Sequence, residues 1–171
     1  DGGTVGVSYF GDMDLINPCG VSPDAGGVYR AKQFRDGLSK KYDIDASLAM
    51  IVKQRAKASE IERMDLVGSV DGCDVIIVDD MVDTAGTLTH AADLMMQKGA
   101  LSVRAICTHA LLSGDAHEKI ENSRLEELIV TDTIPPKKKS KKIKVLSCAK
   151  IFAETMHNVH HNKSISSNYI I

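Results

Sequence analysis

The sequence of 171 residues has no tryptophan, four prolines, four cysteines and 4% aromatic residues. Its cysteines are scattered and form no CxxC pair, which disfavours both a disulfide framework and a cysteine zinc site. The sequence also lacks an apolar stretch long enough to span a membrane, and its first residues lack the basic and apolar segments of a signal peptide. We therefore expect reduced thiols, a cytoplasmic location and no membrane partner.

Charge of one sign does not dominate either. The net charge is −2 at pH 7, which gives no overall attraction to nucleic acid. With 43% hydrophobic and 26% charged residues, the chain has the composition of a globular domain that can bury a sizeable core. The most basic stretch, PPKKKSKK at Pro135 to Lys142, could be an address signal or an anion-binding patch, but we interpret it as a solvated loop between two strands.

The segment DVIIVDDMVDTAGTLTHAADLM, Asp74 to Met96, contains the clearest pattern in the sequence. Its apolar run Val75 to Val78 predicts a strand buried on both faces, as in a parallel sheet, with Asp79 at the carboxyl end. From Thr87 onward apolar residues recur at helical spacing, and Gly99 is a plausible stop. A loop that joins a strand to a helix in this way is where open α/β sheets bind ligands.

The chemistry of this loop favours a sugar phosphate. Small residues from Thr84 through Ala85 and Gly86 to Thr87 allow backbone N–H groups to approach an anion, and the helix begins there. Asp79 and Asp80 repel phosphate, so they should face hydroxyl groups or a divalent cation. Paired aspartates can also simply cap a helix, but a third carboxylate, at Asp83, and the glycine loop favour a ligand.

A second candidate anion site is SPDAGG, Ser22 to Gly27. Gly26 and Gly27 would let backbone amides approach an oxyanion at the start of the following helix, and Asp24 could hold a cation bound to that anion. Turns of this composition are common, so the segment alone could be an ordinary turn. Together with the first loop, it suggests a substrate with phosphate at both ends.

The remaining predicted elements alternate in type. They are a helix near Val28 to Leu38, a strand Ser47 to Val52, a strand Val103 to Thr108, a helix near Asp115 to Asn122, a strand Leu128 to Val130, a short strand Ile143 to Leu146 and a closing helix Ala149 to His160. This order predicts an α/β fold, a doubly wound parallel sheet in a single domain.

Two groups of side chains need separate interpretation. Lys53 and Arg55 open a charged stretch without clear periodicity, so we expect them on a mobile loop after the strand. His157, His160 and His161 have a spacing that could bind metal, but a helix carboxyl end, which favours cations, is the simpler interpretation.

The segment VIIVDDMVDTAGT resembles the ribose-phosphate-binding signature shared by phosphoribosyltransferases and by ribose-phosphate pyrophosphokinases, also called PRPP synthetases. Five further segments resemble the carboxyl-terminal half of the PRPP synthetases in order and spacing. They are VSPDAGG, KQRAKASEIERM, THALLSGDA, TDTIP and the tail HNKSIS. The resemblance covers about Val21 to Ile171 and implies a phosphoribosyltransferase-like fold.

The resemblance implies transfer of the diphosphoryl group of ATP to the anomeric hydroxyl of ribose 5-phosphate, giving PRPP and AMP with Mg²⁺ as cofactor. It assigns the 5-phosphate to Asp83, Thr84, Ala85, Gly86 and Thr87, and the ribose hydroxyls to Asp79 and Asp80. It assigns the pyrophosphate, with magnesium at Asp24, to Asp24, Ala25, Gly26 and Gly27, and stabilisation of the moving group to Lys53 and Arg55.

The tail residues Ser164, Ser166 and Tyr169 resemble a family segment that lines an effector site for phosphate or nucleotide between subunits. The alternative is a free polar tail. The family also implies a homo-oligomer and a second, similar domain that supplies most adenine contacts, so the ATP site should be incomplete here.

The first residues depart from the family pattern. We expect residues 1–20 to be an atypical segment ahead of a domain at 21–171. In the family SPDAGG follows a buried strand directly, and here Val5 to Phe10 could form that strand only across a long, unusual loop. Two other functions stay open: a phosphoribosyltransferase that consumes PRPP, and a non-catalytic regulatory subunit. Intact Lys53 and Arg55 argue against an inherited loss of activity.

Overall fold

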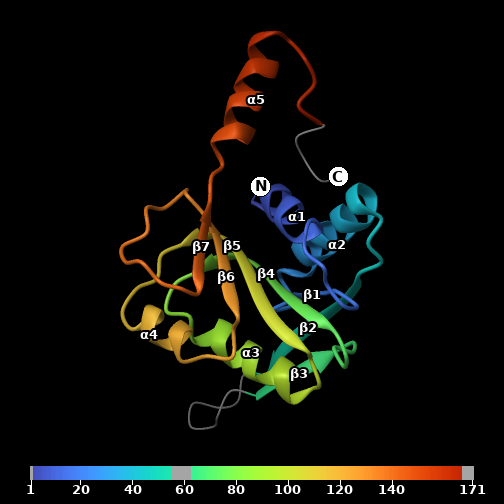
Figure 1. Cartoon of the computed structure of the whole chain (residues 1–171), viewed down its shortest axis with the longest axis vertical. Helices are drawn as coiled ribbons and strands as arrows, with labels where there is room; N and C mark the ends of the chain where they lie inside the picture. The colour runs from blue at the N-terminus through green and yellow to red at the C-terminus, as the bar shows by residue number, and fades with distance from the viewer. Residues whose placement is uncertain (1, 55–62, 167–171) are drawn as a thin grey trace.

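The structure is a computed structural model that describes residues 2–54 and 63–166 (Figure 1). Its strands are β1 (Cys19–Ser22), β2 (Ser47–Gln54), β3 (Arg63–Val67), β4 (Asp74–Val82), β5 (Ser102–Ala110), β6 (Glu127–Thr131) and β7 (Ile143–Leu146). Its helices are α1 (Gly3–Gly11), α2 (Val28–Tyr42), α3 (Gly86–Gln97), α4 (Ala116–Glu121) and α5 (Ala149–His160). The predicted α/β class is confirmed.

One seven-stranded sheet organises the chain, in the order β3-β2-β1-β4-β5-β6-β7. All neighbours pair in parallel except β3, which runs antiparallel to β2 at one edge. Successive residues of β4 alternate between two cores: Val75 and Ile77 pack with α3 and α4, whereas Ile76 and Val78 pack with α1 and α2. Helices therefore cover both faces of the sheet, and the all-apolar run of β4 is the result.

Residues 3–11 do not form the strand considered for Val5 to Phe10. They form helix α1, in which Val7 and Phe10 are buried. The Phe10 ring makes an edge-to-face contact with the Phe34 ring of α2, with the ring centroids 5.8 Å apart. The strand that leads into SPDAGG is β1, four fully buried residues. It is too short and too rich in turn-forming neighbours to show a strand pattern, but β2 and β4 flank it on both sides.

The stretch after Lys53 was also misinterpreted in part. Strand β2 continues to Gln54, and Arg63–Val67 forms β3 alongside it, so Lys53 lies on a strand and not on a loop. Strand β3 contains charged residues and shows no apolar pattern, because an exposed edge strand does not need one, so the sequence did not indicate it.

Helix α2 extends beyond the predicted end at Leu38, to Tyr42, and Lys40 and Lys41 suit a helix carboxyl end.

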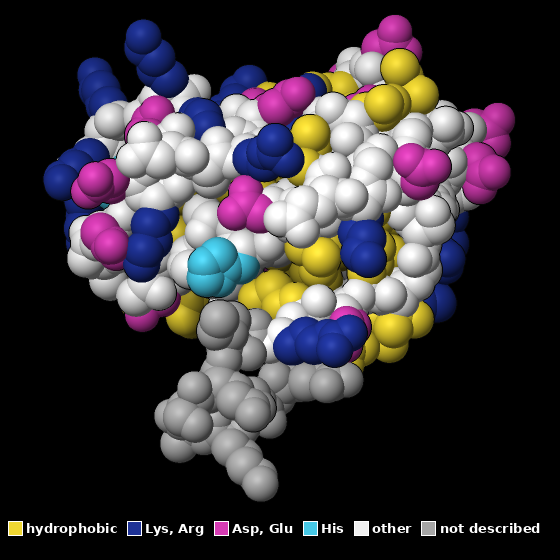
Figure 2. Space-filling view, turned by 90° about the horizontal axis from the view of Figure 1, so that it is seen from below, with side chains coloured by type: hydrophobic (Ala, Val, Ile, Leu, Met, Phe, Trp, Pro, Cys, Tyr) yellow, Lys and Arg dark blue, Asp and Glu magenta, His cyan; other side chains and the backbone are white. Residues whose placement is uncertain are grey.

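Helix α5 projects from the rest of the molecule (Figure 1). None of its residues is buried, and Phe152, Met156 and Val159 are 59–65% exposed at helical spacing. On the face shown in Figure 2, cationic and anionic side chains are interspersed around a hydrophobic area, in keeping with the balanced charge. No helix in the described part of the chain is long and apolar enough to cross a membrane.

Candidate active site

The site lies where the direction of strand order reverses. Strands β1 and β4 are neighbours, but β1 leads through α2 to β2 on one side, whereas β4 leads through α3 to β5 on the other. After β1 the chain leads to a helix on one face of the sheet, and after β4 it leads to a helix on the other face. A crevice therefore opens between the two loops that follow these strands. These loops are the two predicted anion sites, Pro23–Gly27 and Asp83–Gly86.

A cavity of about 200 Å³ opens at these strand ends. Its lining residues come from three separate segments and are Asp24, Lys53, Asp79, Met81, Val82, Asp83, Thr84, Ala85, Gly86, Thr87 and Leu88. The structure thus brings Asp24, Lys53 and Asp79 together with the whole Asp83–Thr87 loop. The sequence alone predicted these residues but could not place Lys53 beside the loop.

The Asp83–Thr87 loop is held from behind by the segment that follows β5. The amides of Leu111 and Leu112 donate to Val82 O at 3.0 and 3.2 Å, that of Ser113 donates to Asp83 O at 3.0 Å, and Lys119 Nζ donates to Thr84 O at 3.4 Å. In a trans peptide the carbonyl and the next N–H point in opposite directions. The N–H groups after these carbonyls therefore face away from that segment.

The turn into α3 completes this arrangement. Ala85 has a φ of 60°, and Gly86 begins the helix. A Cβ on Gly86 would meet only Thr84 Oγ1, at 4.0 Å, so the space beside it is open. Outward-turned amides, a helix amino terminus and open space together form a cradle suited to a phosphate group.

The Pro23–Gly27 loop is built as a tight turn and still leaves room for a ligand. Asp24 Oδ1 accepts the Gly27 N–H at 2.9 Å, and Ser22 Oγ donates to Asp24 O at 2.6 Å. A Cβ on Gly27 would lie 2.7 Å from Ser22 Oγ, so a side chain at this position would force Ser22 to move, whereas Gly26 has only Asp24 Oδ1 nearby, at 3.4 Å. The turn and ligand interpretations of SPDAGG are therefore compatible.

Burial makes Asp79 chemically distinct from its neighbour. Its side chain is 24% exposed, against 59% for Asp80. Burial raises the pKa of the Asp79 carboxyl above its ordinary 3.8, and the neighbouring Asp80 carboxyl adds to the increase, whereas the Asp80 N–H and Arg30 oppose it; the resulting pKa is about 6. Asp79 should therefore be ionised at neutral pH but protonated in mild acid, and a ligand that donates hydrogen bonds to it would favour the ionised form.

Two cations at the site have contrasting partners. Lys53 Nζ donates to Thr87 Oγ1 at 3.1 Å, which places an ammonium group at the mouth of the phosphate cradle. Arg30, which the sequence analysis did not single out, donates from Nη2 to Asp80 Oδ2 at 2.7 Å, with Nη1 3.7 Å from Asp79 Oδ1. Its place in the first turn of the helix after SPDAGG was the available signal. No sequence signal pointed to Lys119, because its contact with Thr84 depends on tertiary structure.

Other predicted residues lie elsewhere. Ser164 Oγ is 2.8 Å from Ser166 Oγ beyond α5, while Arg55 and Tyr169 fall outside the described residues. The effector role of this tail stays a prediction. His157 and His160 occupy the last turn of α5, and the described residues include no cluster of three or more His, Cys, Asp or Glu side chains able to hold a metal.

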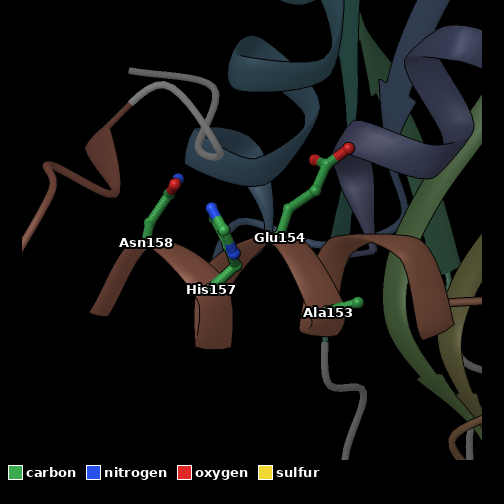
Figure 3. Close-up of a pocket in the computed structure, with 4 residues that line it drawn as sticks. All are labelled: Ala153, Glu154, His157 and Asn158. Carbon is green, nitrogen blue, oxygen red and sulfur yellow. The ribbon is translucent and has the colours of Figure 1, made fainter. Parts of the chain in front are cut away.

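A second hollow, of about 570 Å³, lies along α5. Its described lining residues come from that helix alone: Ala153, Glu154, His157 and Asn158 (Figure 3). Figure 3 shows Glu154, His157 and Asn158 extending from the same side of the helix. A surface formed by one helix offers no convergent groups from separate elements, so the strand-end cavity is the candidate active site.

Known proteins resemble this chain along most of its length. Residues 32–170 match the sequence model of the phosphoribosyl synthetase-associated domain. The chain is 47% identical to the ribose-phosphate pyrophosphokinase of Wolinella succinogenes over 169 residues, which is 99% of this chain and 53% of that protein. The chain thus spans about half the length of the curated relatives it matches.

Solved structures agree with this similarity. The phosphoribosylpyrophosphate synthetase of Mycobacterium smegmatis superimposes with a TM-score of 0.79 at 32% identity, over 94% of this chain and 51% of that one. The purine phosphoribosyltransferase of Pyrococcus horikoshii shares the fold, with a TM-score of 0.51 at 15% identity over 85% of this chain and 84% of that one.

Proposed function

The chain belongs to the phosphoribosyl synthetase family, and from that premise we propose that it supplies one half of a ribose-phosphate pyrophosphokinase. The proposed reaction transfers the diphosphoryl group of ATP to the anomeric hydroxyl of ribose 5-phosphate, giving PRPP and AMP. The observation that carries the proposal is the strand-end cavity, in which Asp24, Lys53 and the Asp83–Thr87 loop meet. Two anion cradles with a cation between them suit a sugar phosphate that gains a diphosphate.

The sugar phosphate would bind along β4. Outward-facing amides and hydroxyls of Asp83–Thr87 would hold the 5-phosphate. Carboxylate oxygens of Asp79, which lines the cavity, and of Asp80, the next residue of β4, would accept hydrogen bonds from the ribose hydroxyls. This arrangement would fix the orientation of the ligand, because the carboxylates would repel the phosphate if the sugar phosphate bound in the reverse direction. The anomeric carbon would then face the Pro23–Gly27 loop across the crevice.

The diphosphoryl group would move between the Pro23–Gly27 loop and Lys53. The anomeric oxygen forms a bond to the β-phosphorus of ATP and gives up its hydroxyl proton to water, as the bond from that phosphorus to the oxygen of AMP breaks and AMP leaves. Negative charge that develops on the phosphoryl oxygens is stabilised by Lys53, together with Arg55. Positioning and electrostatics carry such a transfer, so the chain needs no nucleophile of its own.

The residues present fit a magnesium ion of the kind that substrate phosphates bring with them. Mg²⁺ commonly binds one or two carboxylates plus phosphate oxygens and waters. Asp24 lines the cavity, and one of its oxygens accepts the Gly27 N–H. Its other oxygen is the natural ligand for an ion held mainly by the diphosphate, and that ion would neutralise charge there.

The complete enzyme would also need a second half that this chain does not contain. Because the chain spans about half of its relatives, most adenine contacts would come from the other half. A homo-oligomer is also proposed, and the exposed apolar stripe of Phe152, Met156 and Val159 on α5 supports it.

The test is ATP-dependent product formation. AMP and PRPP would be measured with ATP and ribose 5-phosphate, for this chain alone and for this chain joined to the remaining half of the Wolinella succinogenes relative. We expect AMP release that requires ribose 5-phosphate in the joined protein and little in the chain alone. PRPP loss that depends on a nucleobase and not on ATP would instead identify a phosphoribosyltransferase, and a joined protein without turnover would favour a regulatory subunit.

A further inference from the structure

Arg30 lies between the Pro23–Gly27 loop and the carboxylates of Asp79 and Asp80 on β4. It belongs to the first turn of α2, directly after the Pro23–Gly27 loop, and its guanidinium reaches across to β4. On one side Nη2 bonds Asp80 Oδ2 at 2.7 Å and Nη1 is 3.7 Å from Asp79 Oδ1. On the other side, a Cβ on Gly27 would lie only 3.2 Å from Nη1, so the guanidinium rests against the glycine backbone.

This position creates competition for the carboxylates. The proposed sugar site needs oxygens of Asp79 and Asp80 to accept hydrogen bonds from ribose hydroxyls. Arg30 already uses one oxygen of Asp80 and approaches one of Asp79. As long as the guanidinium stays there, fewer acceptor positions are available to a sugar.

The ion pair is suited to release. The Arg30 and Asp80 side chains are 31% and 59% exposed, and pairs that remain this accessible to water contribute little to stability. A diphosphate on the neighbouring loop would be a stronger partner, because the planar guanidinium can bind phosphate oxygens in bidentate fashion. Arg30 needs only a side-chain rotation, since its backbone already lies beside that loop.

We propose that Arg30 exchanges partners, leaving Asp79 and Asp80 for a diphosphate on the Pro23–Gly27 loop, and thereby couples the diphosphate site to the sugar site. The inference rests on the proposed function of the two loops. Diphosphate binding frees the carboxylates for the sugar hydroxyls, so each ligand increases the affinity for the other. By linkage the increase is the same factor in both directions.

Calorimetry on the 171-residue chain can test this coupling, with ribose 5-phosphate and magnesium pyrophosphate as probes. The dissociation constant of ribose 5-phosphate is measured without pyrophosphate and with pyrophosphate at saturation. For the wild type we expect a decrease of about 5-fold or more, the lower end of typical allosteric coupling. Arg30→Met and Arg30→Gln should reduce the ratio to about one, with ribose 5-phosphate alone binding as well as before or better.

Arg35 provides a matched control on the same helix. Its side chain is also 31% exposed, and its Nη2 pairs with Asp36 at 2.6 Å, away from the cavity lining. Arg35→Met should therefore keep the wild-type coupling. Arg30→Lys, which retains the charge without the planar fork, should restore part of it.

The outcomes separate the two levels of the proposal. Binding of both ligands to the wild type without coupling, or full coupling in a folded Arg30→Met protein, would overturn the partner exchange and leave the proposed function standing. Failure of the wild type to bind either ligand would overturn the proposed function and the exchange together.

Discussion

Replacement of Asp79 by asparagine should stabilise the unliganded protein. The wild-type fold holds a carboxyl whose pKa is about 6 because of burial, whereas the unfolded chain returns it to 3.8. Below the unfolded value both states are protonated, so wild type and variant should differ little. As pH rises from 3.8 to about 6, the unfolded chain releases this proton while the folded wild type still holds it, so the free energy of unfolding falls relative to the variant. The difference reaches on the order of 2–3 kcal/mol near pH 6 and stays constant above it.

Urea unfolding followed by circular dichroism measures this difference, at several pH values from 3.8, the unfolded pKa of Asp79, up to slightly alkaline pH. Asp80→Asn is the matched control: Asp80 is 59% exposed and bonds Arg30 at 2.7 Å, so its loss should destabilise slightly, by at most about 1 kcal/mol. The Asp79→Asn variant should also bind ribose 5-phosphate more weakly at neutral pH, by about 1–3 kcal/mol, since an amide replaces one acceptor. A stability difference independent of pH, or a less stable Asp79→Asn at neutral pH, would refute the reasoning.

Three further predictions concern other residues around the site. Lys53→Met, in the joined two-half protein, should lower kcat at least about ten-fold with little change in ribose 5-phosphate affinity, because the ammonium acts mainly on the transition state; an increase in KM alone would contradict its role. Lys119→Met should weaken ribose 5-phosphate binding a few-fold, by roughly 0.5–1.5 kcal/mol, because Thr84 O loses a hydrogen-bond donor, and Lys119→Arg should retain the affinity. Lys32→Met is the control, because Lys32 pairs with Asp36 at 2.8 Å as Lys119 does with Asp115. Equal weakening by Lys32→Met would show a general charge effect instead. Cys107 should resist iodoacetamide in the folded protein, because burial and the nearby Asp79 raise its pKa to about 12, and rapid native labelling followed by mass spectrometry would disprove that environment.

The sequence was most informative where a pattern was long or chemically distinctive. The apolar run of β4 and the helical spacing of α3 predicted both elements, because burial on two faces and on one face leave different periodicities. The closing helix and the strand Ile143–Leu146 were confirmed at their predicted bounds. The short strand β1 and the polar edge strand β3 were missed because neighbouring strands, and not their own residues, define them.

The site could be predicted as a set of residue types but not as a geometry. Asp24, Lys53 and Asp79 were identified from separate motifs, and only the sheet order brings them to one cavity. Arg30 and Lys119 act through tertiary contacts, with partners 50 and 35 residues away along the chain. No local pattern specifies such pairs, so the sequence suggested the class of ligand but not these two contacts.

We propose above that the Asp83–Thr87 loop binds the phosphate of ribose 5-phosphate. An amide NMR titration of this chain with ribose 5-phosphate, with ribose as the matched ligand without phosphate, tests it most directly. We expect the largest shifts at the backbone amides of Asp83–Thr87 with ribose 5-phosphate, and far smaller shifts there with ribose. Shifts of equal size with both ligands, or shifts that leave this loop unaffected, would contradict it.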